Sequence, residues 1–234
     1  MMEKKKVVVV AGTRPEVIKM ASVYMELQRS DLLEPVFLST GQHREMLAQA
    51  FGAFNLAPDH DLKLMKPGQD LTGLTARVLQ AVGTYLEETR PDAVLVQGDT
   101  TSVLASAMAA FYQNIPVGHV EAGLRTYDMQ SPWPEEMNRR LVSPLCRWHF
   151  LPTEVSKANL LQEKICEASC HVTGNTVIDS LFWMSNKVNA EEDRTAAVAE
   201  RLNIPIFFRE NFLEHKDKRW VLVTAHRREA HGGG

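Results

Sequence analysis

Acidic side chains that could exchange a proton with a substrate stand at three places in the sequence. Asp99 comes just after the run Ala93–Gln97, Glu121 closes the next apolar run, and the pair Glu135–Glu136 stands at the start of a predicted helix. Asp99 could instead cap a helix, and Glu135–Glu136 would be favourable in a first turn without any chemical role. Glu121 resists such an explanation, because a carboxylate ending a buried strand faces either costly desolvation or a functional pocket. Carboxylates that share a cleft push their pKa values apart, which allows an acid and a base to coexist.

Two basic side chains, Arg14 and Lys19, could hold an anionic group such as a diphosphate. Arg14 follows the first apolar run, and Lys19 lies five residues later on a helix that Pro15 opens. Backbone N–H groups at that helix start add partial positive charge. The net charge is −3, so no global field attracts nucleic acid or an anionic membrane, and an anionic ligand needs local groups of this kind. The alternative is that both residues are solvated surface charges.

Short apolar runs rich in valine alternate with longer segments of helical period, and these elements must position the polar residues. The runs predicted to be strands are Val7–Ala11, Pro35–Ser39, Ala93–Gln97, Pro116–Glu121, His149–Leu151, Cys170–Thr173 and Trp220–Thr224. The segments predicted to be helices are Glu16–Arg29, Arg44–Phe54, Leu71–Glu88, Ser102–Tyr112, Glu135–Ser143, Glu154–Glu163 and Val177–Val188. Because runs apolar on both faces suit parallel strands covered on two sides, we predict right-handed βαβ units in a doubly wound α/β sheet.

Nearly every predicted strand ends in a tight polar cluster. The clusters are Gly12–Glu16, Gly41–Glu45, Gly98–Thr101, Glu121–Arg125, Gly174–Thr176 and His226–Glu229. In open parallel sheets, ligands bind outside the carboxyl ends of the strands, so all six clusters are expected in one crevice. One cluster could arise by chance, but six on successive strand ends predict a site.

The length of 234 residues is too long for one doubly wound unit and too short for two. We therefore predict a complete N-terminal domain over residues 1–174 and the beginning of a second Rossmann-like domain over 175–234, incomplete in this chain.

Several other classes of protein are disfavoured. After the first predicted strand only Gly12 is present where a dinucleotide fingerprint needs G-x-G-x-x-G, and no Walker A motif occurs, which argues against NAD-type and P-loop chemistry. The apolar run Val7–Ala11 is too short for a secretory signal or a membrane span. The three cysteines, Cys146, Cys166 and Cys170, are expected to be reduced thiols in a cytoplasmic protein, with no metal site.

Seven segments, in order along the chain, contain the strand-end residues together with their flanks. They are Gly12–Lys19, Gln42–Leu47, Gly98–Thr101, Gly118–Thr126, Ser131–Glu136, Thr173–Asp179 and His226–Glu229. These segments closely resemble the non-hydrolysing UDP-N-acetylglucosamine 2-epimerases, and their shared order makes the match specific although any one alone would be weak.

This resemblance implies an isomerase that interconverts UDP-N-acetylglucosamine and UDP-N-acetylmannosamine. Members of that family resemble two-domain glycosyltransferases of the GT-B fold, pair as homodimers, and eliminate UDP across C1–C2 before re-adding it with C2 inverted. No cofactor would be needed, in keeping with the missing nicotinamide fingerprint. The residues implied are Arg14, Lys19 and Arg139 for substrate binding, and Asp99, Glu121, Glu135 and His226 for catalysis, with His226 coming from the second domain.

Two other interpretations of the sequence stay open. A glycosyltransferase of the same architecture would share the crevice but would not need three carboxylates around C2 of the sugar. The 234-residue chain could also be an inactive fragment, because the distal segment that grips UDP in the family is not present in it.

Overall fold

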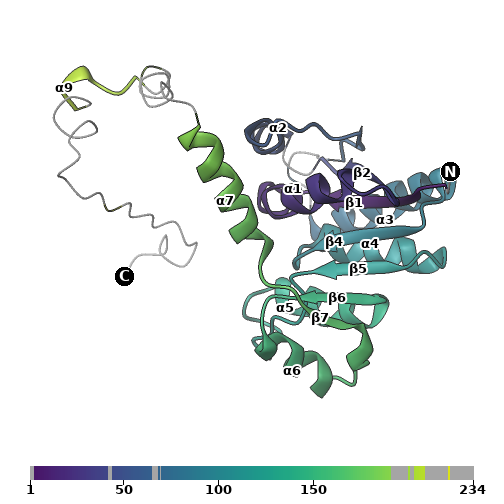
Figure 1. Cartoon of the computed structure of the whole chain (residues 1–234). Helices are drawn as coiled ribbons and strands as arrows, with labels where there is room; N and C mark the ends of the chain where they lie inside the picture. Colours follow the sequence, from purple (N-terminus) through teal and green to yellow (C-terminus); the bar gives the residue numbers. More distant parts are fainter. Residues whose placement is uncertain are drawn as a thin grey trace. The chain divides into compact units, whose positions relative to one another are not determined.

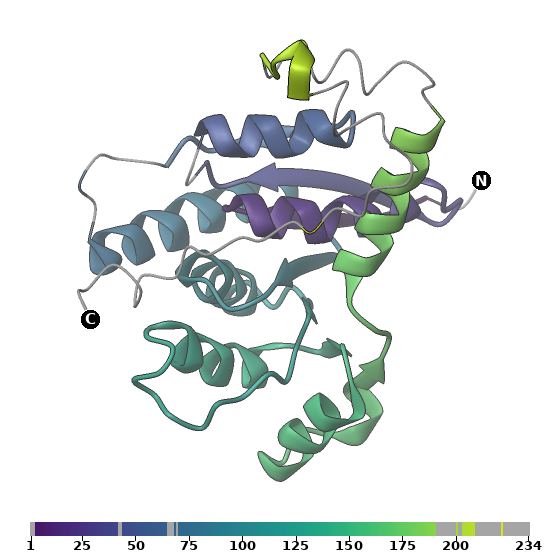
Figure 2. The same ribbon diagram turned by 90° about the vertical axis from the view of Figure 1, so that its left-hand side faces the viewer.

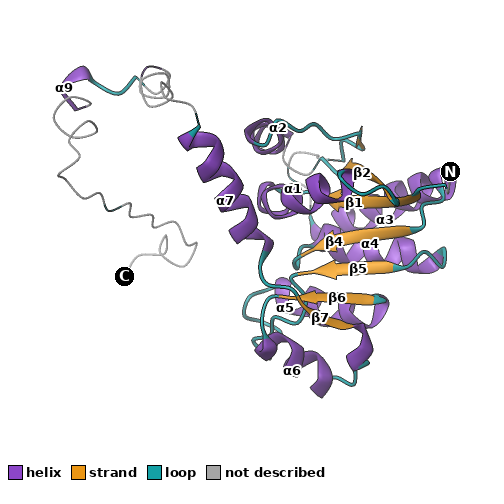
Figure 3. Ribbon diagram, in the orientation of Figure 1, coloured by secondary structure: helices purple, strands orange, loops and turns teal. Residues whose placement is uncertain are grey.

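In the described part of the chain, seven strands form one parallel sheet in the order β3-β2-β1-β4-β5-β6-β7 (Figure 1). The computed structural model describes residues 3–41, 44–64, 68, 70–190, 200, 203–208 and 221. The strands are β1 (Lys5–Ala11), β2 (Leu33–Ser39), β3 (His60–Asp61), β4 (Ala93–Gln97), β5 (Val117–Val120), β6 (Trp148–Leu151) and β7 (Cys170–Val172). All neighbouring pairs are parallel, so the carboxyl ends of the strands meet at one edge, where the arrowheads of Figure 3 point.

In the described part of the chain, helices follow the strands in turn. They are α1 (Arg14–Gln28), α2 (Arg44–Ala53), α3 (Leu71–Thr89), α4 (Thr101–Tyr112), α5 (Glu135–Val142), α6 (Glu154–Gln162), α7 (Thr176–Asn189) and the short α9 (Ile206–Phe208). Two 3₁₀ turns, η1 (Ser143–Leu145) and η2 (Glu167–Ser169), precede β6 and β7. In both views α2 and α6 lie toward opposite edges of the sheet (Figure 1, Figure 2).

The core has two layers because β1 is apolar on both faces. Val8 and Val10 pack with residues of α3 and α4, whereas Val7 and Val9 pack with α1 and α2 on the other face. This is the period-2 alternation of a strand buried on both sides. The predicted doubly wound α/β class is confirmed, and none of the described helices is both long and apolar enough to cross a bilayer.

The order of the strands reverses between β1 and β4. From β1 the chain winds outward through β2 and β3, then returns to β4 on the other side of β1 and continues to β7. Such a reversal leaves a crevice at the carboxyl ends of the two central strands, which is the usual place for a ligand in this class of sheet. Arg14 follows β1 and Asp99 follows β4, so the topology brings both to the reversal.

The structure differs from the predicted elements in a few places. The two-residue strand β3 was not predicted, because His60 and Asp61 are too few to show a period. Helix α1 begins at Arg14, two residues before the prediction, and β5 ends at Val120, so Glu121 lies just outside the strand. The predicted strand over 220–224 lies outside the described residues except for position 221.

Contacts divide the chain into two compact units, Met1–Ser185 and Asn186–Gly234. The first part of α7 belongs to the first unit: the Ser180 hydroxyl donates to the Ile18 carbonyl at 2.5 Å, and Trp183 packs against Phe54. The predicted domain boundary at 174/175 stays a prediction, because most of the second unit lies outside the described residues.

Candidate active site at the carboxyl ends of the strands

Glu121 is the centre of a hydrogen-bonded cluster that joins four segments of the chain. Its Oε2 accepts from Nζ of Lys19 on α1 at 2.5 Å and from the amide of Gln97 at the end of β4. Its Oε1 accepts from Nδ2 of Asn175 at 3.2 Å. The side chains of Lys19 and Glu121 are 23% and 11% exposed, so the pair is shielded from solvent but not fully buried. Sequence positions 19, 97, 121 and 175 are therefore neighbours in space.

The backbone at Glu121 is unusual for a residue with a side chain. Its φ is +63°, in the left-handed region, which costs a non-glycine residue about 1–2 kcal/mol. The surrounding hydrogen bonds hold it there, and such strain clusters at functional sites. The result is that the carboxylate turns toward α1 and the end of β4 instead of continuing the alternation of β5.

Asp99 is held by two consecutive residues of α5. The Arg139 guanidinium contacts Oδ2 of Asp99 through Nε at 2.8 Å and Nη2 at 2.6 Å, and the Asn138 amide donates to the Asp99 carbonyl at 2.8 Å. Asp99 is not the cap of α4, the alternative that its position left open, because the Thr100 hydroxyl accepts from Val103 N there. The Asp99 carboxylate thus lies beyond the carboxyl end of β4, paired with Arg139.

Of the adjacent acids at the start of α5, it is Glu136 that is buried and bonded. Its carboxylate is fully buried, accepts from the backbone N–H groups of Thr126 and Tyr127, and contacts Nη1 of Arg139 at 3.3 Å. Burial acts to raise the pKa of Glu136, but these hydrogen bonds outweigh it and leave the pKa below its ordinary value. Glu135 is half-buried and has no side-chain hydrogen bond or ion pair in the described part of the chain.

Glu16 ties the end of β1 to the start of α4. Its Oε2 accepts from the backbone N–H groups of Gly12 and Thr13 at 2.6 and 2.8 Å, and its Oε1 accepts from the Thr100 hydroxyl at 2.6 Å. Thr13 and Glu16 have the spacing of a capping box, which explains why α1 begins here. Burial raises the pKa of Glu16 above its ordinary value, although those three hydrogen bonds oppose the shift. Glu16 is a structural carboxylate beneath the site.

Two buried histidines support the same edge. His119 on β5 lies with Nε2 2.7 Å from the Gly98 carbonyl oxygen, and since that oxygen can only accept, Nε2 carries the proton. Its Nδ1 is buried without a partner among the described residues. Burial lowers the pKa of His119 to about 4 and also lowers that of His149, whose Nε2 donates to the Ser143 carbonyl at 3.0 Å. Both rings are therefore neutral above pH 7. The hydrogen bond from His119 to the Gly98 carbonyl fixes the backbone just before Asp99.

The structure brings four of the seven predicted site residues into contact, in two pairs. Lys19 contacts Glu121, and Arg139 contacts Asp99. Arg14 is exposed at the first position of α1 and, within the described ranges, its guanidinium has no ion-pair partner. Glu135 stands on the helix that holds Asp99, but its side chain contacts none of the other site residues that the structure describes. His226 lies outside the described residues.

Several residues of the cluster were not singled out from the sequence. Glu16 was detectable through its capping-box spacing from Thr13. Gln97 was hidden as the last residue of an apolar run, and Asn175 gave no signal beyond its place in a polar cluster. The contact of Arg139 with Glu136 has the i,i+3 spacing of a helix, but its contact with Asp99 depends on packing that no spacing rule specifies.

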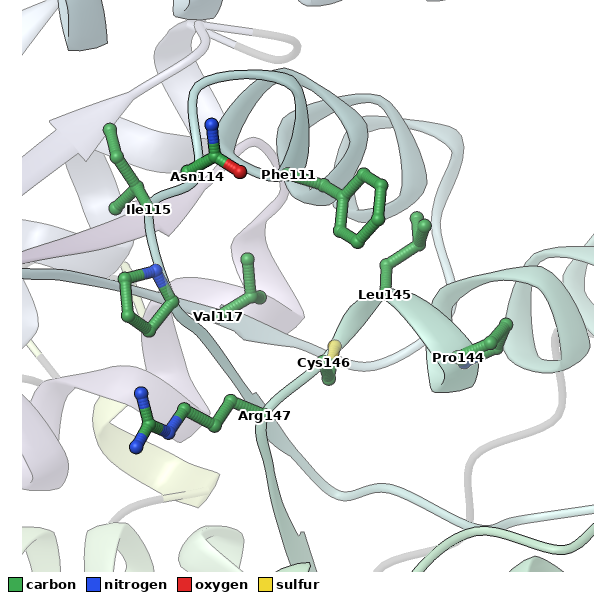
Figure 4. Close-up of a pocket in the computed structure, with 9 residues that line it drawn as sticks. Phe111, Asn114, Ile115, Val117, Pro144, Leu145, Cys146 and Arg147 are labelled. Carbon is green, nitrogen blue, oxygen red and sulfur yellow. The ribbon is translucent and has the colours of Figure 1, made fainter.

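None of three cavities in the first unit coincides with this cluster. One of about 310 Å³ lies at the amino ends of the strands, where Ile115 and Val117 enter β5 and Cys146 and Arg147 lead into β6 (Figure 4). Others of about 410 and 490 Å³ run along α1 near Val23. Within the described ranges no group of three or more His, Cys, Asp or Glu side chains is arranged to hold a metal ion, and all three cysteines are free thiols.

Comparisons with known proteins agree on one family. Residues 25–234 match the sequence model of the family described as UDP-N-acetylglucosamine 2-epimerase. The chain is 50% identical over 229 residues to a UDP-N-acetylglucosamine 2-epimerase of Yersinia pestis and 49% identical over 229 residues to that of Escherichia coli K12. Each alignment covers 98% of this chain and 58% of the relative, so the chain spans somewhat more than half the length of these relatives.

Solved structures give the same picture. The UDP-GlcNAc 2-epimerase of Neisseria meningitidis, determined with bound UDP-GlcNAc, is 47% identical with a TM-score of 0.83, covering 97% of this chain and 58% of that one. The enzyme of Methanocaldococcus jannaschii, in complex with UDP-GlcNAc and UDP, is 34% identical with a TM-score of 0.76, covering 82% and 52%. A lipopolysaccharide outer core galactosyltransferase at 13% identity and a TM-score of 0.54, over 73% and 45%, shares the fold alone. The chain belongs to the UDP-N-acetylglucosamine 2-epimerase family.

Proposed function

We propose that the protein interconverts UDP-N-acetylglucosamine and UDP-N-acetylmannosamine, and that this chain supplies the carboxylates that act on the sugar. The observation that carries the proposal is the pairing of Glu121 with Lys19 and of Asp99 with Arg139 at the reversal point of the sheet. Relatives of this family have been determined with UDP-GlcNAc bound, which supports a UDP-sugar as the ligand.

The proposed chemistry is elimination of UDP followed by its re-addition. The proton on C2 is barely acidic, so departure of the diphosphate from C1 must lead and C1 must gain positive character. Carboxylates close to C1 and C2 stabilise that charge, and one of them accepts the C2 proton as the C1–C2 double bond forms. Return of a proton to the opposite face and of the UDP oxygen to C1 gives the epimer. The oxidation level does not change, so the scheme requires no nicotinamide.

We propose that three of the predicted carboxylates act on the sugar directly. Glu121, Asp99 and Glu135 are the candidates for proton exchange on the two faces of C2. Inversion needs access from both faces, hence more than one carboxyl group. General acid–base help of this kind is worth roughly 10²–10⁴-fold in rate per group.

The cations have separate roles in the proposal. Arg14 is exposed and unpaired within the described ranges, at a helix start that favours anions, so it is the candidate for the diphosphate. Lys19 and Arg139 already contact carboxylates, so they orient Glu121 and Asp99 and balance their charge as well as facing the substrate. Holding the departed UDP in place makes the return step unimolecular. His226 is proposed to reach the same site from the second domain.

Further parts of the proposal concern the assembly. We expect the protein to act in the cytoplasm as a homodimer. We also expect the 234-residue chain by itself to lack turnover, because the relatives contain sequence that it does not. Turnover by the 234-residue chain alone would contradict that expectation.

The test is incubation of the full-length gene product with UDP-N-acetylglucosamine in deuterated water, followed by proton NMR. Epimerisation predicts deuterium at C2 and appearance of the manno epimer with no acceptor added. A glycosyltransferase of the same fold would release UDP or transfer the sugar without deuterium at C2, and that result would overturn the proposal.

A further inference from the structure

The two oxygens of the Glu121 carboxylate are held differently. Oε2 accepts two hydrogen bonds, from Nζ of Lys19 at 2.5 Å and from the side-chain amide of Gln97. In the described structure Oε1 accepts a single longer bond, from Nδ2 of Asn175 at 3.2 Å. Because each carboxylate oxygen offers two lone pairs, Oε2 is fully occupied and Oε1 keeps capacity for a proton or a further donor.

Gln97 is well placed to fix this orientation. It is the last residue of β4, a central strand paired with both β1 and β5, and it is 2% exposed. The next residue is anchored too, since Gly98 N donates to the Val120 carbonyl at 3.1 Å. The long side chain of Lys19 can turn toward a bound anion. The side chain of Gln97, in contrast, is buried on a backbone that the sheet fixes, and it carries no charge.

We propose that Gln97 is a positioning residue for Glu121, holding Oε2 so that Oε1 is the oxygen that exchanges a proton with the sugar. The inference rests on the proposed function. In the elimination step Oε1 takes the proton from C2, the C2–H electron pair becomes the C1–C2 double bond, and the C1–O electron pair leaves with UDP. In the reverse step the same oxygen can return that proton.

The groups that face Glu121 define what a substitution at position 97 would change. Within the described ranges, Lys19 from α1 is the charged group in contact with it, and Gln97 from β4 and Asn175 from the segment before α7 are neutral donors. An acceptor at position 97 would therefore oppose Glu121, whereas a protonated carboxyl there would restore a donor. Two carboxyls that share one proton titrate as a coupled pair.

Two substitutions in the full-length gene product separate positioning from packing. Gln97→Met removes the donor at similar size, and Gln97→Glu preserves every heavy-atom position while making donation depend on a proton. Gln113→Met is the matched control, since the Gln113 amide also donates, to the Gly83 carbonyl at 2.6 Å, but at the far end of α4. The assay is kcat and KM for epimerisation between about pH 6 and pH 9, with circular dichroism as the folding check.

We expect Gln97→Met to lower kcat by about 10–100-fold at every pH, the loss of one hydrogen bond to a charged group, with KM changed less than about 3-fold. Gln97→Glu should lose at least as much at pH 9 and recover progressively toward pH 6, as the introduced carboxyl becomes protonated and donates again. Gln113→Met should behave like the natural protein. Should Gln97→Met fail to fold, the pH dependence of the isosteric Gln97→Glu decides alone.

Two results would overturn the inference: kcat unchanged in both variants, or a Gln97→Glu profile parallel to that of the natural protein. Either can be told apart from failure of the proposed function, because that would appear as absence of C2 deuteration in the natural protein itself.

Discussion

Replacing His119 with glutamine tests whether this buried ring makes the fold sensitive to acid. Glutamine can keep an N–H donor near the Gly98 carbonyl, which the ring contacts through Nε2 at 2.7 Å, but it does not titrate. The pKa of His119 is lowered from 6.5 to about 4, mainly by burial. Below pH 6.5 the unfolded chain therefore takes up a proton that the folded chain does not, and stability falls as the pH falls toward 4.

The size of the effect follows from that pKa difference. The full shift corresponds to about 3 kcal/mol, at 1.36 kcal/mol for each pH unit. About 2 kcal/mol of this is lost between pH 7 and pH 5, because most of the titration of the unfolded histidine lies in that window. His149 also has a lowered pKa and Glu16 a raised one, but both remain in the variant and cancel in the comparison.

The assay is urea denaturation of the 234-residue chain at pH 7 and pH 5, followed by far-UV circular dichroism. We expect the pH-dependent loss of unfolding free energy to be smaller by about 2 kcal/mol in His119→Gln than in the natural chain. His60→Gln, at an exposed histidine in β3, is the control and should keep the natural pH dependence. Equal losses in the natural chain and His119→Gln would refute the account of His119 as a neutral buried ring.

Other predictions concern stability and are read from the same denaturation experiment. Gly123→Ala should destabilise by about 2–4 kcal/mol, because φ is +82° and the new Cβ would lie 2.4 Å from a backbone carbonyl in α6; a change under about 0.5 kcal/mol would contradict this. Arg125→Met should lower the free energy of unfolding by about 3–5 kcal/mol, because it leaves Glu163 unpaired. Adding Glu163→Gln should restore part of that loss, and an additive loss in the double variant would count against the ion pair. Thr100→Val should lower the free energy of unfolding by about 1–2 kcal/mol, since it removes the cap of α4 and a hydrogen-bond donor to Glu16. An unchanged free energy of unfolding would show that neither bond contributes to stability.

The sheet was predictable from the sequence because its strands are short and apolar on both faces. The valines of Val7–Ala11 alternate between two helical layers, so composition and length alone identified the central strand. The edge strand β3 could not be found this way, since two exposed residues carry no period. The predicted range of α1 began two residues late, at Glu16, although Pro15 was already expected to open the helix because Pro is favourable in a first turn.

The site was predictable in its residues but not in its pairing. Asp99 and Glu121 follow adjacent strands, so topology alone places them at one edge. That Lys19 would contact Glu121, and Arg139 would contact Asp99, depends on side-chain directions set by α1, α5 and the left-handed backbone at Glu121. The hydrogen bonds of Gln97 and Asn175 to Glu121 were harder still to predict, because neutral polar residues carry no charge pattern that marks them in a sequence.

The central claim is that the Glu121 carboxylate exchanges a proton with C2 of the sugar. Its most direct test is the rate of deuterium incorporation at C2 of UDP-N-acetylglucosamine by the full-length gene product, compared between Glu121→Gln and Glu167→Gln, an exposed glutamate paired with Lys157. We predict that Glu121→Gln stays folded and exchanges at least about 10²-fold more slowly, whereas Glu167→Gln exchanges at the natural rate. Unimpaired exchange in a folded Glu121→Gln would contradict the account.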